Sequence, residues 1–454
     1  MSPDGTPRLV MAINGQYPGP TLYADWGTPC RCTQFGTSWY HSHFSAQYAD
    51  GVVGAIVING PATTNYDTDL GTMTLTDWFY DTAFALNVRA QHSTAGPPTP
   101  NNALINGTMK NANGGGSYLR TKVTKGKKYR LRLINTGIDN LFHVSIDGHK
   151  LTVITSDFVP VKPYTVDSVA IGVGQRHDVV FKADQAIGNY WLRAQPATDC
   201  SRNSNLGNIK SIISYDGASD TDPTSTGITP PTGCYDEPVT PYVANQVPKD
   251  QFAAAAKSFS MDFNVGQAAN LPLIQWLING SDMRVDWGKP SLQYVQENNY
   301  TFEKKMNVFE INQKDMWTFW IIQTVQGDPV NLPHPIHLHG HDFYVLGQGA
   351  GVWDGVVDNL KFSNPPRRDT AHLPRGGWLI IGFPADNPGA WLLHCHIPWH
   401  VGQGLSFQFL ERKDEILGKI GDLSDMKKGC DSWNKYWGTG VSERRPYIQD
   451  DSGL

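Results

Sequence analysis

The chain has 454 residues, a formal net charge of −5, 45 glycines and 30 prolines. This length exceeds what one hydrophobic core supports and suggests about three domains. The mild acidity gives no reason to expect nucleic acid or an anionic membrane surface as a partner, and no apolar run approaches the ~20 residues that span a bilayer.

Strand-like runs recur along the whole chain. Alternating apolar, β-branched and aromatic residues, separated by Gly, Pro and Asn, include residues 52–60, 128–137, 164–174 and 177–194. Such runs predict the strands of β-sandwiches. Convincing long helices are nearly absent, so the predicted fold class is all-β.

Two composition changes divide the chain. One lies near residue 66, and the other is the stretch 216–248, whose Pro, Thr, Asp and Gly predict a linker or a long surface loop. We therefore expect three units, residues 1–66, 67–236 and 237–454.

The six cysteines have different surroundings. Cys200 and Cys234 flank a loop-like stretch, where a disulfide is plausible in an oxidising compartment. Cys395 lies among histidines and is a candidate metal ligand. Cys30, Cys32 and Cys430 leave an odd thiol. No signal peptide is recognisable after Met1, although three glycosylation sequons fit secretion: Asn106, Asn279 and Asn299.

An internal repeat relates the second and third units. When residues 336–346 are set over 144–154, His337 falls on Ser145 and His339 on Asp147. When 389–396 is set beside 188–195, the histidines of the third unit fall on Arg193 and Gln195. We interpret the two units as copies of one sandwich, of which the middle copy lacks the histidines. His341 matches His149 in this comparison, which favours a structural role for it.

Eight of the fourteen histidines and one cysteine form three tight groups: His41 and His43; His334, His337 and His339; His394, Cys395, His396 and His400. Alternate residues of a strand share a face, so each His-X-His pair offers two imidazoles to one place. On this argument Cys395 faces away from His394 and His396. With His334 and His400 it would form the Cys-plus-two-His set of a blue copper centre, with Leu405 as an apolar axial neighbour. The alternative is a zinc site or a packed aromatic core, but closed zinc sites use only four ligands.

These motifs resemble a known family. "HPIHLHGH" (334–341), "HCHIPWH" (394–400) and "GTSWYHSHFSAQYADGVVG" (36–54) are similar to multicopper oxidases, specifically laccases of ascomycete fungi. The resemblance extends over nearly the whole chain. It implies three cupredoxin-like Greek-key domains, four copper ions, secretion, a monomer and a part in lignin breakdown. It also implies one-electron oxidation of phenols and four-electron reduction of dioxygen to water.

The resemblance also implies roles for individual residues. His334, Cys395 and His400 would hold the type 1 copper and His337 the type 2 copper, while the type 3 pair would take His41, His43, His339, His394 and His396. Asp157 would receive the phenolic proton, and Trp276 would line the phenol pocket. The last four residues would plug the solvent channel to the cluster: Asp451, Ser452, Gly453 and Leu454.

One family motif has no counterpart in this chain. The family carries four His-X-His groups and this sequence has three, because the His-Trp-His-Gly of the first domain is absent. The first unit has about 66 residues, fewer than the ~100 of a complete sandwich. The segment "TPCRC" (28–32) fits no family pattern, so we hypothesise a splice variant or a misjoined gene model. The absence leaves two alternatives open: a non-catalytic blue copper protein, or another multicopper oxidase such as a ferroxidase or ascorbate oxidase.

Overall fold

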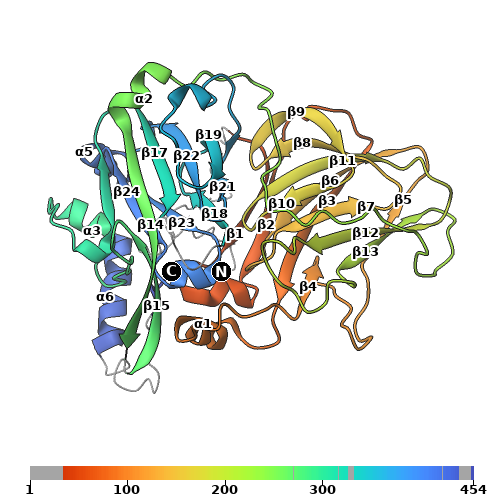
Figure 1. The fold of residues 1–454 in the computed structure, drawn as a ribbon, viewed down its shortest axis with the longest axis horizontal. Coiled ribbons are helices and arrows are strands. Elements are labelled where there is room, and N and C mark those ends of the chain that lie inside the picture. The colour runs from red at the N-terminus through yellow and green to blue at the C-terminus, as the bar shows by residue number, and fades with distance from the viewer. Residues whose placement is uncertain (1–33, 269, 315, 326–331, 422, 439–450) are drawn as a thin grey trace.

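The structure is a computed structural model that describes residues 34–438 and 451–454, apart from 269, 315, 326–331 and 422. Two β-sandwiches lie side by side, and a short β-hairpin sits at their junction (Figure 1). Cys30 and Cys32 lie outside the described residues. The all-β prediction is confirmed, and no described helix is long and apolar enough to cross a membrane.

The middle sandwich consists of two sheets. The first has the order β10-β7-β12-β13-β5, with the bounds Val169–Ile171, Phe142–Ile146, Asn189–Pro196, Lys210–Tyr215 and Arg120–Val123. The second has the order β4-β3-β6-β11-β8-β9, with the bounds Asn102–Ile105, Thr68–Trp78, Lys128–Asn135, Arg176–Lys182, Leu151–Ser156 and Val159–Val166. Apolar side chains from both sheets form one buried core.

The C-terminal sandwich also has two sheets. One has the order β16-β24-β23-β18-β21, with the bounds Val308–Ile311, Ser406–Glu411, Gly389–Cys395, His334–Leu338 and Thr370–Leu373. The other has the order β15-β14-β17-β22-β19-β20, with the bounds Leu271–Ile278, Ala256–Ala268, Trp317–Thr324, Gly377–Pro384, Phe343–Ala350 and Arg367–Arg368.

The strand pairing of the two sandwiches supports the internal repeat. β7 and β12 pair with Ser145 opposite Arg193, and β18 and β23 pair with His337 opposite His394. The parallel pair of β13 with β5 likewise corresponds to the parallel pair of β24 with β16. The predicted correspondence of single residues therefore holds at the level of strand register.

The first unit contributes the hairpin of β1 (Gly36–His41) and β2 (Val53–Ile58). It lies against the six-stranded sheet of the middle sandwich because that face is polar rather than apolar. In β6, Arg130 and Arg132 alternate with core leucines, and both form ion pairs with the buried Asp178. The Thr37 hydroxyl of β1 donates to the same carboxylate over 2.7 Å. This contact holds β1, and so His41 at its end, at the junction.

Short helices surround the junction and the outer sheet. They are η2 (Ser45–Asp50), α1 (Ala83–Gln91), α2 (Lys249–Ala255), α3 (Ser291–Gln296), η3 (Lys304–Met306), η4 (Val357–Asn359), α4 (Pro398–Gly402), α5 (Lys413–Ile420) and α6 (Ser424–Tyr436). The stretch 216–248 contains no helix or named strand, as expected of a linker or loop. The unit boundaries themselves stay a prediction.

Candidate metal centres

Cys395, His334 and His400 converge inside the C-terminal sandwich. The Sγ of Cys395 lies 3.6 Å from Nδ1 of both histidines, and the two Nδ1 atoms are 3.1 Å apart. Metal–nitrogen bonds of about 2.0 Å and metal–sulfur bonds of about 2.3 Å would put trigonal ligands about 3.5 to 3.7 Å apart. The three side chains therefore surround a space that fits one late first-row metal ion, and the soft thiolate favours copper.

Strand register explains how the chain separates these ligands from their neighbours. Ile336 pairs with Cys395, and the next pair is His337 with His394. Successive side chains of a strand point to opposite faces, so Cys395 and His394 look in opposite directions. Pro398 opens α4, which brings His400 back to the Cys395 side. The predicted opposition of the cysteine to its flanking histidines is thus observed.

Burial controls the protonation of this first centre. It raises the pKa of the Cys395 thiol and lowers the pKa of His400 to about 3. Neutral imidazoles are ready to bind metal, whereas the thiol must lose its proton when the metal arrives. The ring of Trp276 packs 4.7 Å from His334 and 5.0 Å from His400, measured between ring centroids. The axial role of Leu405 stays a prediction.

Six further imidazoles form a second centre on the other face of the same strands. We call this group the histidine cage, and its members are His41, His43, His337, His339, His394 and His396. Neighbouring ring centroids lie between 4.7 and 5.6 Å apart. Trp39 stacks on His41 at 4.4 Å and encloses the cage from the β1 side. All six histidines that the resemblance assigns to the cluster thus meet in one place.

Backbone carbonyls determine which ring nitrogens of the cage are free. Nδ1 donates to a carbonyl oxygen in His41 (Ser42, 3.0 Å), His337 (Asp369, 2.8 Å) and His394 (Cys395, 2.8 Å). A carbonyl can only accept, so Nδ1 carries the proton and Nε2 keeps its lone pair. Buried ring nitrogens of His43 and His396 have no hydrogen-bond partner. Burial lowers the pKa of His41 to about 4 and also lowers the pKa of His43, His339, His394 and His396, which favours neutral imidazoles at these five positions.

The cage suits metal ions, but it has too few histidines for the full trinuclear cluster of the family that the sequence resembles. That cluster draws on four His-X-His groups, and this chain supplies three. Residues 1–33, which lie outside the described structure, contain no histidine, so they cannot supply the fourth. We therefore derive no reaction step through a three-metal cluster.

Two cavities meet at His400. The larger, of about 370 Å³, is mostly apolar and is lined by Phe263, Trp276, Trp399 and Gln403 among others. The smaller is lined by Asp139, His372, Cys200 and Ile397 among others. Leu332 and His400 belong to both. Trp276 thus lines an apolar cavity, and its part in a phenol pocket stays a prediction.

The structure does not place Asp157, the expected proton acceptor, at either cavity. Asp157 is fully buried away from both cavities, where it accepts from the backbone N–H groups of Arg176 and Asp369 and forms an ion pair with the Arg176 guanidinium. Asp139 is the one carboxylate among the described residues that line the two cavities. Burial, and then the charge of Asp77, raise the pKa of Asp139 to about 8. The sequence offered no signal for it, because an aspartate in "NTGIDN" (135–140) reads as an ordinary turn.

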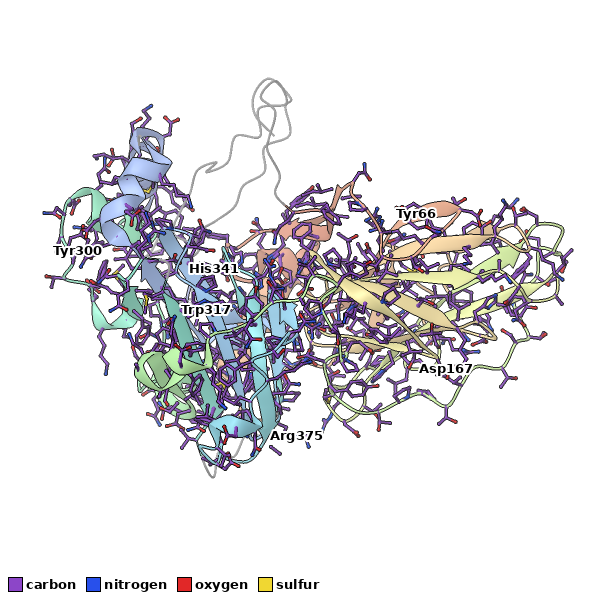
Figure 2. The ribbon with its side chains drawn as sticks, turned by 90° about the horizontal axis from the view of Figure 1, so that it is seen from above. Tyr66, Asp167, Tyr300, Trp317, His341 and Arg375 are labelled. Carbon is purple, nitrogen blue, oxygen red and sulfur yellow. A yellow bond between two sulfur atoms is a disulfide. The ribbon has the colours of Figure 1, made fainter. Side chains whose placement is uncertain are left out.

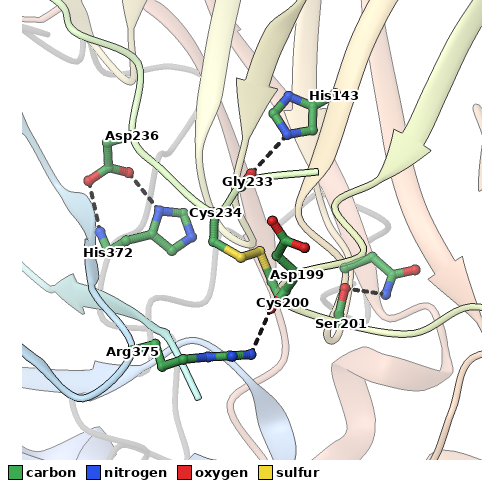
Figure 3. The surroundings of a disulfide bond; sticks show 10 residues. His143, Asp199, Cys200, Ser201, Gly233, Cys234, Asp236, His372 and Arg375 are labelled. Atoms are coloured by element: carbon green, nitrogen blue, oxygen red, sulfur yellow. Dashed lines mark hydrogen bonds and ion pairs between the residues drawn. A yellow bond between two sulfur atoms is a disulfide. The ribbon is translucent and has the colours of Figure 1, made fainter. Parts of the chain in front are cut away.

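The predicted disulfide joins Cys200 to Cys234 at the edge of the smaller cavity (Figure 3). Beside it, Nδ1 of His372 lies 2.7 Å from Asp236, and Arg375 donates to the carbonyl of Asp199. Cys430 is buried in α6 and has no disulfide partner among the described residues.

The remaining predicted sites have clear positions. Ser452 and Leu454 are buried, and Leu454 belongs to the same apolar cluster as Leu392, which shares a strand face with His394. Their role as a plug stays a prediction. Asn106 and Asn279 occupy equivalent turns with positive φ, and each accepts a backbone hydrogen bond from a neighbouring strand. These two asparagines therefore have a structural use besides their sequons. Glycosylation there and at Asn299 remains untested.

His149 and its counterpart His341 in the repeat are structural in both sandwiches. His149 lies 2.7 Å from the Tyr215 hydroxyl, and His341 lies 2.6 Å from the buried Glu411 carboxylate. Tyr215 and Glu411 are the last residues of the corresponding strands β13 and β24. Figure 2 shows His341 within the C-terminal sandwich. This agrees with the structural role expected for His341.

Comparisons with known proteins agree with this geometry. Multicopper oxidase family models match residues 28–63, 69–218 and 238–415. Laccase-3 of Botryotinia fuckeliana is 46% identical over 86% of this chain and all of its own length. The laccase of Neurospora crassa is 40% identical over all of this chain and 82% of its own length. That alignment spans 523 positions, so the relative has residues without a counterpart here.

Solved structures show the same likeness. The laccase of Botrytis aclada superposes with a TM-score of 0.84 at 40% identity, covering 93% of this chain and 77% of that one. Fet3p, a multicopper oxidase that functions in iron import, gives 0.75 at 25% identity, covering 88% and 77%. On the strength of the family matches, the relatives and the convergent ligands, this chain belongs to the multicopper oxidase family.

Proposed function

We propose that this protein is a laccase-like oxidase that removes single electrons from phenols and passes them to dioxygen. The proposal rests on His400, which both lines a cavity and belongs to the first centre. Its ring lines an apolar cavity large enough for a phenol, and its Nδ1 lies 3.6 Å from Cys395 Sγ. A substrate in the cavity would thus touch a ligand of the first centre.

The ligands of the first centre and several residues of the two cavities have a part in this proposal. His334, Cys395 and His400 would hold a copper ion, which accepts one electron at a time when bound. The rings of Trp276 and Phe263 would hold the phenol by apolar contact. Asp139, in its ionised form, would take the phenolic proton, so that electron and proton leave the substrate together. The peptide bonds from Cys395 to His394 and His396 give a covalent link between the first centre and the cage.

The residues that line the two cavities also help to choose between oxidation of phenols and oxidation of ferrous ions. A site for ferrous ions needs several carboxylates, since hard oxygen donors suit such cations. Among the described residues at the two cavities, Asp139 is the single carboxylate. This supports phenols over iron.

The disulfide and the sequons support secretion. We expect the protein to be a monomer, which light scattering would check.

The test is oxygen uptake by the copper-loaded chain with a simple diphenol. We expect sustained uptake above a copper-only control and none from the Cys395→Ser variant, which lacks the thiolate. A blue protein that the diphenol bleaches without oxygen uptake would instead indicate an electron carrier. The missing fourth His-X-His group is the observation that keeps this second candidate in view.

A further inference from the structure

We propose that the histidine cage binds two metal ions, each through three imidazoles, so that the whole chain holds three copper ions. One ion takes His43, His339 and His394, and the other takes His41, His337 and His396. The identity of the metal rests on the proposed function, whereas the number of ions rests on the geometry of the cage and on the count of its donors.

The first trio is already arranged as a ligand set. One nitrogen from each ring lies within 4.8 Å of the others, and Nε2 of His339 is 3.2 Å from Nε2 of His394. The three centroid separations are 4.9, 5.2 and 5.3 Å. Three imidazoles bound at about 2.0 Å to one ion place their ring centres about 5 to 5.5 Å apart. The observed separations match this requirement.

The second trio is wider than the first, and His396 is the member that lies close to both of the others. The ring centroid of His396 lies 5.1 Å from that of His41 and 5.6 Å from that of His337. His41 and His337 each donate Nδ1–H to a carbonyl, which leaves both Nε2 atoms free to bind. The surrounding chain also holds His396 in place. Its carbonyl accepts from the Tyr48 hydroxyl over 2.9 Å, and a Cβ added to Gly174 would lie 2.7 Å from its ring.

Counting donors excludes the other ways of sharing six imidazoles. One ion bound by the first trio would leave three rings without a metal, among them His396, whose buried Nδ1 has no hydrogen-bond partner among the described residues, which is costly. Three ions would receive only two protein ligands each, fewer than the three of typical open sites. Two ions with three imidazoles each use every ring once. This arrangement differs from the three-ion cluster that the resemblance implies.

Metal counting tests the proposal without any catalytic assay. The chain is loaded with copper, freed of excess by gel filtration, and its copper per chain is measured by mass spectrometry. We expect three ions per chain in the parent protein, two in Cys395→Ser and two in His337→Ala. His92→Ala, which changes a histidine outside both centres, should keep three. Retention of the blue absorption by His337→Ala would show that this variant is folded.

Electron paramagnetic resonance adds a second readout. Two metal ions in a shared site lie about 3.5 to 4 Å apart. Two cupric ions at that distance would couple magnetically through an oxygen ligand common to both, so we expect the cage to contribute no signal. We therefore expect the integrated signal to equal one of the three coppers, and the Cys395→Ser variant to be silent. Two ions in the parent protein, four ions, or a separate signal from an isolated non-blue copper would each overturn the proposal. A parent protein that holds three copper ions but does not oxidise the diphenol would refute only the proposed function.

Discussion

Arg193 donates from Nε to Oδ1 of Asp147 over 2.8 Å, at the place where the C-terminal sandwich brings His394 against His339. The two positions are equivalent in strand register, because Ser145 pairs with Arg193 as His337 pairs with His394. The middle sandwich thus has an ion pair where its counterpart has candidate metal ligands. Asp147 is nearly fully buried and also accepts from the Ser225 hydroxyl over 2.7 Å.

This ion pair should contribute to the stability of the middle sandwich. Asp147→Asn leaves the Arg193 guanidinium partly buried beside a neutral amide, which we expect to lower the unfolding free energy by about 2 to 3 kcal/mol. Denaturant unfolding of the copper-free protein measures the change. Asp220→Asn, which breaks an exposed ion pair with Arg120, should cost less than about 1 kcal/mol. Equal effects of the two variants would contradict the argument.

The sequence predicted those features that depend on local pattern. Strand alternation gave the all-β class, and the repeat placed His337 and His394 on equivalent positions of paired strands. The opposite directions of Cys395 and His394 follow from the two-residue period of a strand. Such features need no knowledge of how distant segments pack.

Other features depend on packing between units and could not be predicted. Asp139 reaches the cavity only because the loop after β6 faces the C-terminal sandwich, and no motif marks that loop. The residues around Asp157 resemble the family motif, yet in the fold its carboxylate forms an ion pair with Arg176. The helices α1 and α6 were also missed, since their composition is mixed and they are held by tertiary contacts.

Asp139 should matter for phenols and much less for electron donors that release no proton. Asp139→Asn removes the proton acceptor, so we expect kcat/KM for a diphenol to fall about 100-fold, while oxidation of ferrocyanide is nearly unchanged. With a pKa of about 8, the ionised fraction in the parent rises with pH through that value and levels off above it. The variant should lose this rise. Asp167→Asn, remote and exposed, is the control, and an equal loss with both donors would refute the role.

Gly174 should be required for the position of His396. Its φ is +85°, and an added Cβ would lie 2.7 Å from the imidazole. Gly174→Ala should therefore cost about 1 kcal/mol from the backbone and a further 1 to 3 kcal/mol from the clash, with loss of copper from the cage. Gly126→Ala is matched, since Gly126 has φ +89° and open space around it. It should keep its copper, and similar losses in both variants would rule out the steric explanation.

The Cys200–Cys234 disulfide should stabilise the loop that borders the smaller cavity. It closes a loop with a sequence separation of 34, which corresponds to about 3 to 4 kcal/mol of unfolding free energy in the chain-entropy account. The double variant Cys200→Ser, Cys234→Ser should lose that amount in denaturant unfolding. The parent protein treated with a thiol reductant should behave in the same way, whereas the reductant should not change the variant.

The buried histidines should make the copper-free protein sensitive to acid, and His177 tests this outside the metal centres. His177 is fully buried, its Nδ1 donates to the carbonyl of Thr155, and burial lowers its pKa to about 3. The unfolded chain binds this proton near pH 6.5, so the stabilisation is complete above that pH and is lost as pH falls toward 3. Between pH 7 and 4.5 the loss from this residue should be about 2 to 3 kcal/mol.

The His177→Phe variant should remove that pH dependence. Losing the hydrogen bond to Thr155 lowers stability by a similar amount at every pH, so it cancels when the two pH values are compared. We therefore expect the difference in unfolding free energy between variant and parent to become about 2 to 3 kcal/mol more favourable to the variant at pH 4.5 than at pH 7. Val180→Ala, a core change in the same strand without a titrating group, should show no such difference. A pH-independent effect of His177→Phe would mean that the proton enters the folded protein without cost.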